Sequence, residues 1–291
     1  MKIIEKASQL SPLLSALREQ GLSYGFVPTM GNLHAGHLAL VDAAAEQCDR
    51  VVVSIFINPL QFGPDEDLEA YPCTPEDDEK VLIEHGTSIL YRPTMSDVYP
   101  VGLEHQTRVE VPGLSEILCG SSRPGHFSGV ATVVNRLFNQ MQADKAFFGK
   151  KDYQQYLIIK KMVSDLAMNI EVVGVDTVRL DSGLAMSSRN SYLSASQLEQ
   201  ASGLYLVLQD AVERYRRAPE NYRGIIEHGI AELKNRGFVP DYLTIRRQSD
   251  LKQPGSGDVK LVVLAAAWFG NARLIDNLEF VLPSRSLQST I

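Results

Sequence analysis

His34 and His37, three residues apart, are the side chains whose types and spacing first indicate chemistry. They lie in the run HAGH, between a predicted strand (residues 24–27) and a predicted helix (residues 38–45). The first N–H groups of a helix are unpaired and carry a partial positive charge, so an anion gains hydrogen bonds and a favourable field there. The pattern therefore predicts a phosphate site to which both imidazoles add donors.

Zinc binding and a purely structural turn are the alternative interpretations of this histidine pair. The metalloprotease pattern needs histidines four residues apart with an intervening glutamate, and no third ligand follows His37 at a suitable spacing. A second segment, residues 186–189 with the sequence MSSR, favours phosphate over both alternatives. Its hydroxyls and guanidinium can wrap a polyphosphate.

A third segment places two lysines, Lys150 and Lys151, at the start of a predicted helix that is largely buried beyond its first turn. Positive charge at a helix start opposes the helix dipole, which is unfavourable for stability and favourable for holding phosphate. A solvated surface pair is the alternative. The flanking Gly149 and the pattern Asp152-x-x-Gln155 favour a site.

Five segments together resemble the pantoate–β-alanine ligase (pantothenate synthetase) family over essentially the whole chain. They are residues 27–37 (VPTMGNLHAGH), 58–63 (NPLQFG), 123–127 (RPGHF), 148–155 (FGKKDYQQ) and 186–190 (MSSRN). The first and last indicate only the nucleotidylyl transferase superfamily, whereas QFG and KDxxQ are far more specific. The family commonly has arginine after Tyr71-Pro72, where this chain has Cys73, so a role for that arginine is in doubt here.

The resemblance implies that ATP and pantoate give pantoyl adenylate and pyrophosphate, after which β-alanine gives pantothenate and AMP. It implies an ATP site formed by Met30, Gly31, Asn32, Leu33, His34, Ala35, Gly36, His37, Gly149, Lys150, Lys151, Asp152, Val178, Met186, Ser187, Ser188 and Arg189. His34, His37 and Lys151 would be catalytic, with His37 the usual proton donor. Gln61 and Gln155 would hold pantoate. A transferase that leaves the nucleotide on its product, and a non-enzymatic nucleotide-binding protein, are the alternative functions.

Closure of the site is expected because an acyl adenylate hydrolyses readily in water. The Gly- and Pro-bounded residues 63–74 are the predicted lid. Mg²⁺ should accompany ATP, held mainly by phosphates, with Asp77 or Asp78 as a candidate carboxylate ligand. An acidic first turn of a helix over residues 76–79 is the alternative role for these carboxylates.

Composition agrees with a small-molecule enzyme. The net charge of −7 argues against nucleic acid as a partner, and no apolar run reaches membrane-spanning length. The N-terminus lacks the apolar region of a signal peptide. Cys48, Cys73 and Cys119 form no C-x-x-C pair, which indicates a reducing cytoplasm.

The pattern of predicted strands and helices around these residues indicates an α/β fold with two domains. Residues 1–178 should form a Rossmann-like parallel sheet of the HxGH type that binds ATP and pantoate, with five strands near Phe26, 51–57, 89–91, 146–148 and 171–175. Residues 179–291 should form a smaller α+β lid domain. Its elements are a long helix capped at 194–197, a second helix over 225–234 stopped by Gly237, and a hairpin over 242–264.

A homodimer is also expected from the family resemblance. The stretch that could supply its apolar patch contains Leu114, Ile117, Leu118, Phe127, Val130, Val133 and Val134. The alternative is that these side chains pack under the first domain.

Overall fold

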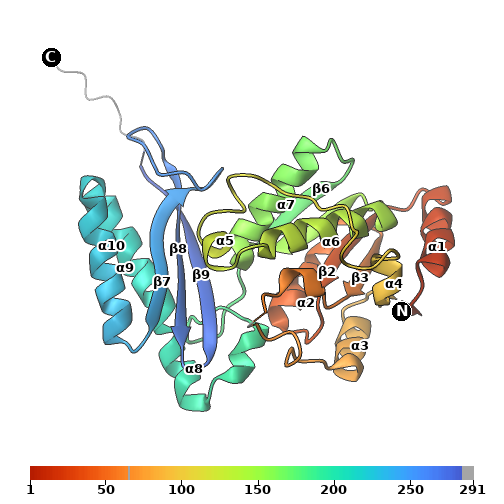
Figure 1. Cartoon of the computed structure of the whole chain (residues 1–291), viewed down its shortest axis with the longest axis horizontal. Helices are drawn as coiled ribbons and strands as arrows, with labels where there is room; N and C mark the ends of the chain where they lie inside the picture. The colour runs from red at the N-terminus through yellow and green to blue at the C-terminus, as the bar shows by residue number, and fades with distance from the viewer. Residues whose placement is uncertain (65, 284–291) are drawn as a thin grey trace. The chain divides into compact units, whose positions relative to one another are not determined.

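The computed structural model describes residues 1–64 and 66–283, which form two compact units (Figure 1). The first holds Met1–Val178 and Met186–Ser188, and the second holds Arg179–Ala185 and the described chain from Arg189 onward. Position 65 of the predicted lid and positions 284–291 of the predicted second domain lie outside the described residues. None of the described helices is long and apolar enough to cross a membrane.

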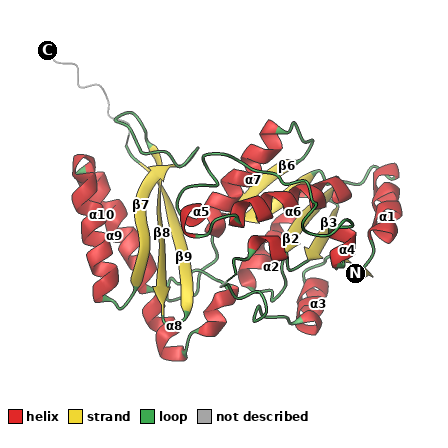
Figure 2. Ribbon diagram, in the orientation of Figure 1, coloured by secondary structure: helices red, strands yellow, loops and turns green. Residues whose placement is uncertain are grey.

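Six parallel strands form the sheet of the first unit, in the order β1-β4-β3-β2-β5-β6. They are β1 (Lys2–Ile4), β2 (Tyr24–Thr29), β3 (Arg50–Ile55), β4 (Ile89–Tyr91), β5 (Lys145–Gly149) and β6 (Glu171–Val175). Helices, red in Figure 2, lie against these yellow strands. The predicted parallel α/β sheet is confirmed, but the count of five strands is wrong. The strand β1 escapes the sequence pattern because only Ile4 of its three residues is buried, whereas all three residues of β4 are buried and apolar.

The helices of the first unit are α1 (Ala7–Glu19), α2 (Ala35–Gln47), α3 (Pro75–Glu84), α4 (Met95–Val98), α5 (Cys119–Ser122), α6 (His126–Met141) and α7 (Tyr153–Asp165), with the 3-10 turns η1 (Pro59–Gln61) and η2 (Lys150–Asp152). The helix α2 packs on β2, β3 and β5, with α3 beside it, whereas α6 packs on β2 and contacts α1 and α7. Burial of the central strands explains the run of valines at 51–53.

The order of the strands reverses at β2. From β2 the chain builds β3 and β4 on one side and later adds β5 and β6 on the other. The carboxyl ends of β2 and β5 therefore flank a topological switch point, where open α/β sheets bind their ligands. The HAGH run follows β2 and the Lys150–Asp152 turn follows β5, so the sheet topology brings these two predicted site segments to one place.

The second unit is an antiparallel sheet of β7 (Val239–Arg247), β8 (Lys260–Phe269) and β9 (Ala272–Val281), with α8 (Ala195–Ala201), α9 (Gly203–Arg217), α10 (Tyr222–Asn235) and the 3-10 turn η4 (Pro219–Asn221). The 3-10 turn η3 (Ser188–Tyr192) leads into it from the first unit. The helix α9 contacts β8 and β9, and α10 contacts β7. The predicted hairpin is confirmed as β7 and β8.

Two local predictions for this unit need correction. Ser194 and Gln197 form the expected capping box, but the helix ends at Ala201 and α9 follows, so the predicted long helix is two helices. The strand β9 escapes the sequence pattern because Asp276 and Asn277 occupy buried positions, which disrupts the alternation typical of a strand. Asp276 is tolerated there because Arg179 forms a bidentate ion pair with it, at 2.7 and 2.9 Å.

The apolar residues considered for a dimer interface mostly pack inside the first unit. Leu114, Phe127, Val130, Val133 and Val134 are all buried in the single chain. The alternative, packing under the first domain, is therefore correct for these five residues. They give no support to the predicted dimer.

Gly129 controls the approach of α6 to η1, the turn that carries Gln61. A Cβ atom at Gly129 would lie 2.2 Å from the carbonyl oxygen of Leu60. We expect Gly129→Ala to lower the free energy of unfolding by about 1–3 kcal/mol, because backbone must move to admit the methyl group. Urea unfolding measures this. The control Gly257→Ala has no atom within 4 Å of the new methyl group and should change stability by less than about 0.5 kcal/mol; equal effects would contradict the packing argument.

Candidate active site

His34 and His37 cap the N-terminus of α2 with their own rings. His34 Nδ1 accepts the Gly36 N–H at 3.1 Å, and His37 Nδ1 accepts the His34 N–H at 3.4 Å. The rings stack with centroids 4.1 Å apart. A ring nitrogen that accepts a hydrogen bond carries no proton, so the proton of each neutral imidazole lies on Nε2. Both rings therefore offer an Nε2–H donor.

The surroundings keep both rings uncharged at neutral pH. Burial, helped by the positive charge of Lys151, lowers the pKa of His34 to about 4. Burial and the neighbouring His34 lower the pKa of His37 to about 3, against the opposing pull of Asp152. The site thus contains two neutral hydrogen-bond donors whose protonation does not change across the physiological pH range.

The backbone of the loop before α2 is also largely satisfied by the protein. Gly31 donates to Thr29 Oγ1 at 3.3 Å, while Asn32 and Leu33 donate to the carboxylate of Asp78 at 2.9 and 2.8 Å. These three N–H groups precede the helix, and at the helix start itself the His34 and Gly36 N–H groups donate to the imidazoles. A neutral imidazole that accepts at Nδ1 keeps its Nε2–H as a donor.

The two candidate magnesium ligands differ in their surroundings. Asp78 is buried and accepts hydrogen bonds from two backbone N–H groups and from Thr74 Oγ1, whereas Asp77 is exposed on the first turn of α3. No three His, Cys, Asp or Glu side chains gather into a metal-binding group anywhere in residues 1–64 or 66–283.

The turn η2 lies beside the histidine pair. The charges of Lys151 and Asp152 both shift the pKa of His34 and of His37, and the Lys151 Nζ is 3.5 Å from the Asp152 carboxylate. Lys150 instead pairs with Asp176 at 2.9 Å. The structure thus brings the β2 and β5 loops together. The charge of Lys151 lowers the pKa of both histidines.

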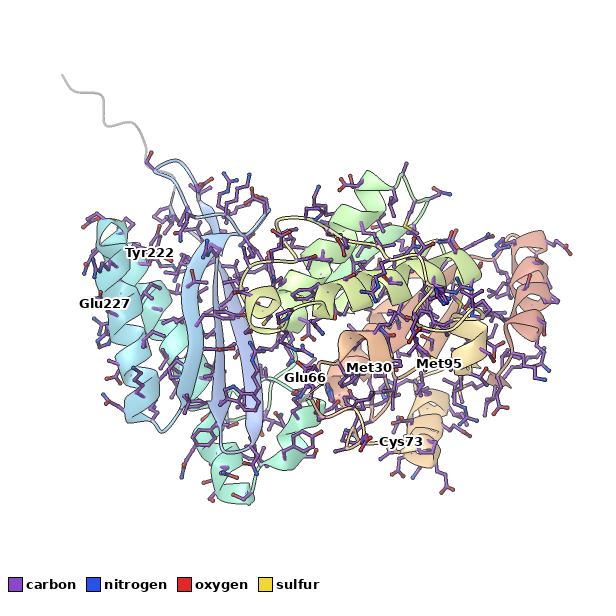
Figure 3. All side chains as sticks on the ribbon, viewed as in Figure 1. Met30, Glu66, Cys73, Met95, Tyr222 and Glu227 are labelled. Carbon is purple, nitrogen blue, oxygen red and sulfur yellow. The ribbon has the colours of Figure 1, made fainter. Side chains whose placement is uncertain are left out.

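Gln61 and Gln155 come from separate elements of the first unit. Gln61 donates to the sulfur of Met30, labelled in Figure 3, at 2.8 Å and accepts from Asn58 Nδ2 at 3.2 Å. Asn58 is buried and holds η1 through Tyr99 and the Gly129 carbonyl, so it fixes the orientation of the Gln61 amide.

The neighbour of Gln155 is structural. Gln154 is buried and bonds the backbone of Leu114, Ile117 and Cys119. Gln155 is only half-buried on α7, so of this pair it is the amide that can meet a ligand.

Three further residues near the site had no assigned role in the sequence. Arg123 makes a bidentate ion pair with Glu66 of the predicted lid, at 2.5 and 2.6 Å, and donates to His126 Nε2 at 3.0 Å. His126 Nδ1 in turn donates to the Gln61 carbonyl oxygen at 2.7 Å. Although burial opposes it, the ion pair with Arg123 lowers the pKa of Glu66 below its ordinary value. The network fastens Glu66, labelled in Figure 3, to the start of α6.

The MSSR run begins against the HAGH loop. Met186 donates its N–H to the Val178 carbonyl oxygen at 2.9 Å, and the Ser188 hydroxyl donates to the Asn32 carbonyl oxygen at 3.4 Å. Met186–Ser188 belong to the first unit, whereas Arg189 belongs to the second.

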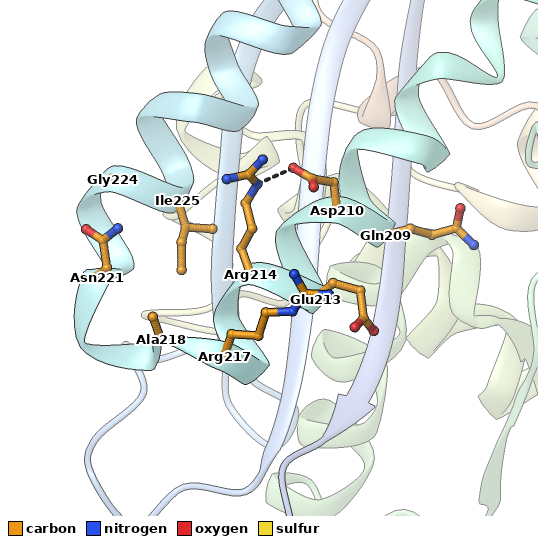
Figure 4. Close-up of a pocket in the computed structure, with 9 residues that line it drawn as sticks. All are labelled: Gln209, Asp210, Glu213, Arg214, Arg217, Ala218, Asn221, Gly224 and Ile225. Atoms are coloured by element: carbon orange, nitrogen blue, oxygen red, sulfur yellow. Dashed lines mark hydrogen bonds and ion pairs between the residues drawn. The ribbon is translucent and has the colours of Figure 1, made fainter.

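A hollow of about 540 Å³ in the second unit is not the predicted site. It lies between α9 and α10, and an ion pair of 2.6 Å joins two of its lining residues, Arg214 and Asp210 of α9 (Figure 4). No residue predicted to bind ATP or pantoate lines it.

Comparison with known proteins agrees with this arrangement. The family model described as Pantoate-beta-alanine ligase matches residues 2–279. Pantothenate synthetase of Shewanella baltica is 54% identical over 265 residues, which cover 91% of this chain and 94% of that relative.

Two solved structures are similar throughout. The crystal structure of pantothenate synthetase from Thermus thermophilus has a TM-score of 0.87 at 42% identity and covers 97% of this chain and 100% of that one. Pantoate-beta-alanine ligase from Francisella tularensis, complexed with beta-gamma ATP and beta-alanine, has a TM-score of 0.78 at 33% identity and covers 96% and 97%. With matches of this extent, the chain belongs to the pantoate–β-alanine ligase family, the enzymes of the ATP-dependent condensation of pantoate with β-alanine.

Proposed function

We propose that this condensation proceeds through pantoyl adenylate at the switch point of the first unit. A pantoate carboxylate oxygen attacks the α-phosphorus of ATP and pyrophosphate leaves; the amine of β-alanine then attacks the acyl carbon and AMP leaves with the bridging oxygen. The observation that carries the proposal is the stacked pair of imidazoles beside Lys151, whose Nδ1 atoms both accept backbone N–H groups. Such fixed donors stabilise charge that gathers on phosphate oxygens during the transfer.

The histidines act as hydrogen-bond donors in this proposal. With pKa values of about 4 and about 3, His34 and His37 hold no extra proton at neutral pH. In this proposal His37 donates a hydrogen bond to phosphate from Nε2–H. Lys151 supplies the positive charge that the neutral rings lack.

Other contacts follow the family resemblance. Asp152 would bond the ribose and Val178 the adenine, while Met186–Ser188, seated on the HAGH loop, and the following Arg189 would contact the triphosphate. The relative from Francisella tularensis, complexed with beta-gamma ATP and beta-alanine, supports binding of ATP and β-alanine here. Gln61 and Gln155 would bond the hydroxyls and carboxylate of pantoate.

Mg²⁺ would be held chiefly by the phosphates. The exposed Asp77 would be its protein carboxylate, since Asp78 already bonds the backbone of Asn32 and Leu33. A cytoplasmic location stays the expectation from the scattered Cys48, Cys73 and Cys119, none of which is in a disulfide. The family resemblance alone supports the homodimer, and light scattering would give its mass.

An isotope experiment tests the adenylate directly. With pantoate labelled with ¹⁸O in its carboxylate, attack on the α-phosphorus must leave one labelled oxygen in the AMP that is released. We expect mass spectrometry to show singly labelled AMP only when pantoate and β-alanine are both turned over. Unlabelled AMP would contradict the adenylate, and absence of free AMP would favour the alternative transferase that leaves the nucleotide on its product.

His37→Asn separates capping from catalysis. The asparagine oxygen can still accept the His34 N–H, but it offers no donor at the position of Nε2, so kcat should fall by about 10²- to 10³-fold with little change in stability. In His37→Ala, kcat should fall by the same factor as in His37→Asn. The free energy of unfolding should also fall, by about 0.5–2 kcal/mol, because the cap is removed. Steady-state kinetics and thermal unfolding measure both; wild-type turnover in His37→Asn would refute the donor role.

Gln61→Ala and Gln155→Ala should weaken pantoate use by about 1–3 kcal/mol each, because the partner group of the substrate is left buried and unpaired. ATP affinity measured without pantoate should barely change. Calorimetric titration with a non-hydrolysable ATP analogue and kinetics with varied pantoate give the two values. Equal losses for both ligands would show that these glutamines support the site without recognising the substrate.

A further inference from the structure

The carboxylate of Asp78 lies behind the HAGH loop, 46 residues away from Asn32 in sequence. Its Oδ2 accepts the Asn32 N–H at 2.9 Å, and its Oδ1 accepts the Leu33 N–H at 2.8 Å and the Thr74 hydroxyl at 3.1 Å. Only 2% of Asp78 is exposed. A buried carboxylate is expensive unless hydrogen bonds satisfy it, and these three donors do so.

The backbone that Asp78 holds has an unusual conformation. Gly31 and Asn32 have consecutive φ angles of +84° and +52°, in the left-handed region. In this turn the N–H groups of Asn32 and Leu33 converge on one carboxylate, as backbone N–H groups of a turn do in anion-binding concavities. Here the anion is the protein's own carboxylate, and a Cβ at Gly31 would lie 3.1 Å from its Oδ2.

Both phosphate-binding segments depend on this turn. Two residues after Asn32 the chain enters α2 at His34, so the turn sets where the stacked imidazoles stand. The carbonyl oxygen of Asn32 accepts the Ser188 hydroxyl at 3.4 Å, so the same turn seats Met186–Ser188.

We propose that Asp78 is a positioning residue for the adenylation step, which holds the Gly31–Leu33 turn so that the imidazole Nε2–H groups and Ser188 meet the triphosphate together. The proposal rests on the proposed function of this site. Asp78 acts through the loop and not as a ligand of Mg²⁺, since Oδ1 already accepts two donors and Oδ2 a third.

Asp78→Asn tests the proposal, because the amide keeps the shape but places an N–H₂ group against the loop N–H groups. Amide hydrogen exchange without substrate should become at least about tenfold faster at Asn32 and Leu33, since their acceptor is weakened. In assays with ATP, kcat/KM should fall by roughly 10- to 100-fold through misplacement of the loop. The Mg²⁺ concentration for half-maximal rate should stay within about twofold of wild type, since no metal ligand is removed.

Glu76→Gln is the matched control, an exposed carboxylate of the same helical turn, and both exchange and rate should remain at the wild-type level. Unchanged exchange at Asn32 and Leu33 in Asp78→Asn would overturn the proposal whatever the enzyme catalyses. A higher Mg²⁺ requirement that accounts for the rate loss would overturn it in favour of a metal ligand. If Asp78→Asn does not fold, Thr74→Ala takes its place. Hydrogen exchange at Asn32 and Leu33 should then become faster, by less than in Asp78→Asn. Unchanged exchange in Thr74→Ala would contradict the proposal.

Discussion

Two hydrogen bonds from backbone N–H groups to imidazole nitrogens decide the chemistry of this site. Because Gly36 and His34 donate to the Nδ1 atoms of His34 and His37, each ring must carry its proton on Nε2. Both rings are thereby fixed at the positive end of α2, where the proposed function places the phosphates. A helix start that is capped in this way has neutral donors without needing a protonated histidine.

The remaining architecture serves to hold that pair in place. The reversal of strand order at β2 brings Lys151 to the histidines, and Asp78 fixes the turn that leads into α2. A second network, from Glu66 through Arg123 and His126, ends at the backbone of Gln61. Fixed dipoles and charges of this kind suit a transfer in which charge accumulates on phosphate oxygens, because they need no rearrangement when the charge appears.

The sequence predicted the parts of the structure that depend on local pattern. Valine runs and glycine-bounded turns located five of six parallel strands, and the spacing of HAGH placed the histidines at a helix start. It could not show that Asp78 caps the loop, because that contact joins residues 46 apart and an acidic first turn has the same appearance in sequence. The strand β9 was missed for a similar reason, because Asp276 can be buried in it only through its ion pair with the distant Arg179. The sequence pattern therefore cannot predict which distant groups pair with a charged residue.

The protonation state of His34 and His37 is the central claim, and a long-range ¹⁵N–¹H correlation spectrum of histidine-labelled protein tests it most directly. The variants His34→Asn and His37→Asn assign the two rings. The account predicts that both show the neutral, Nε2-protonated form from about pH 8 down to about pH 5, since their pKa values are about 4 and about 3. A ring protonated on Nδ1, or one that titrates near its ordinary pKa of about 6.5, would contradict it.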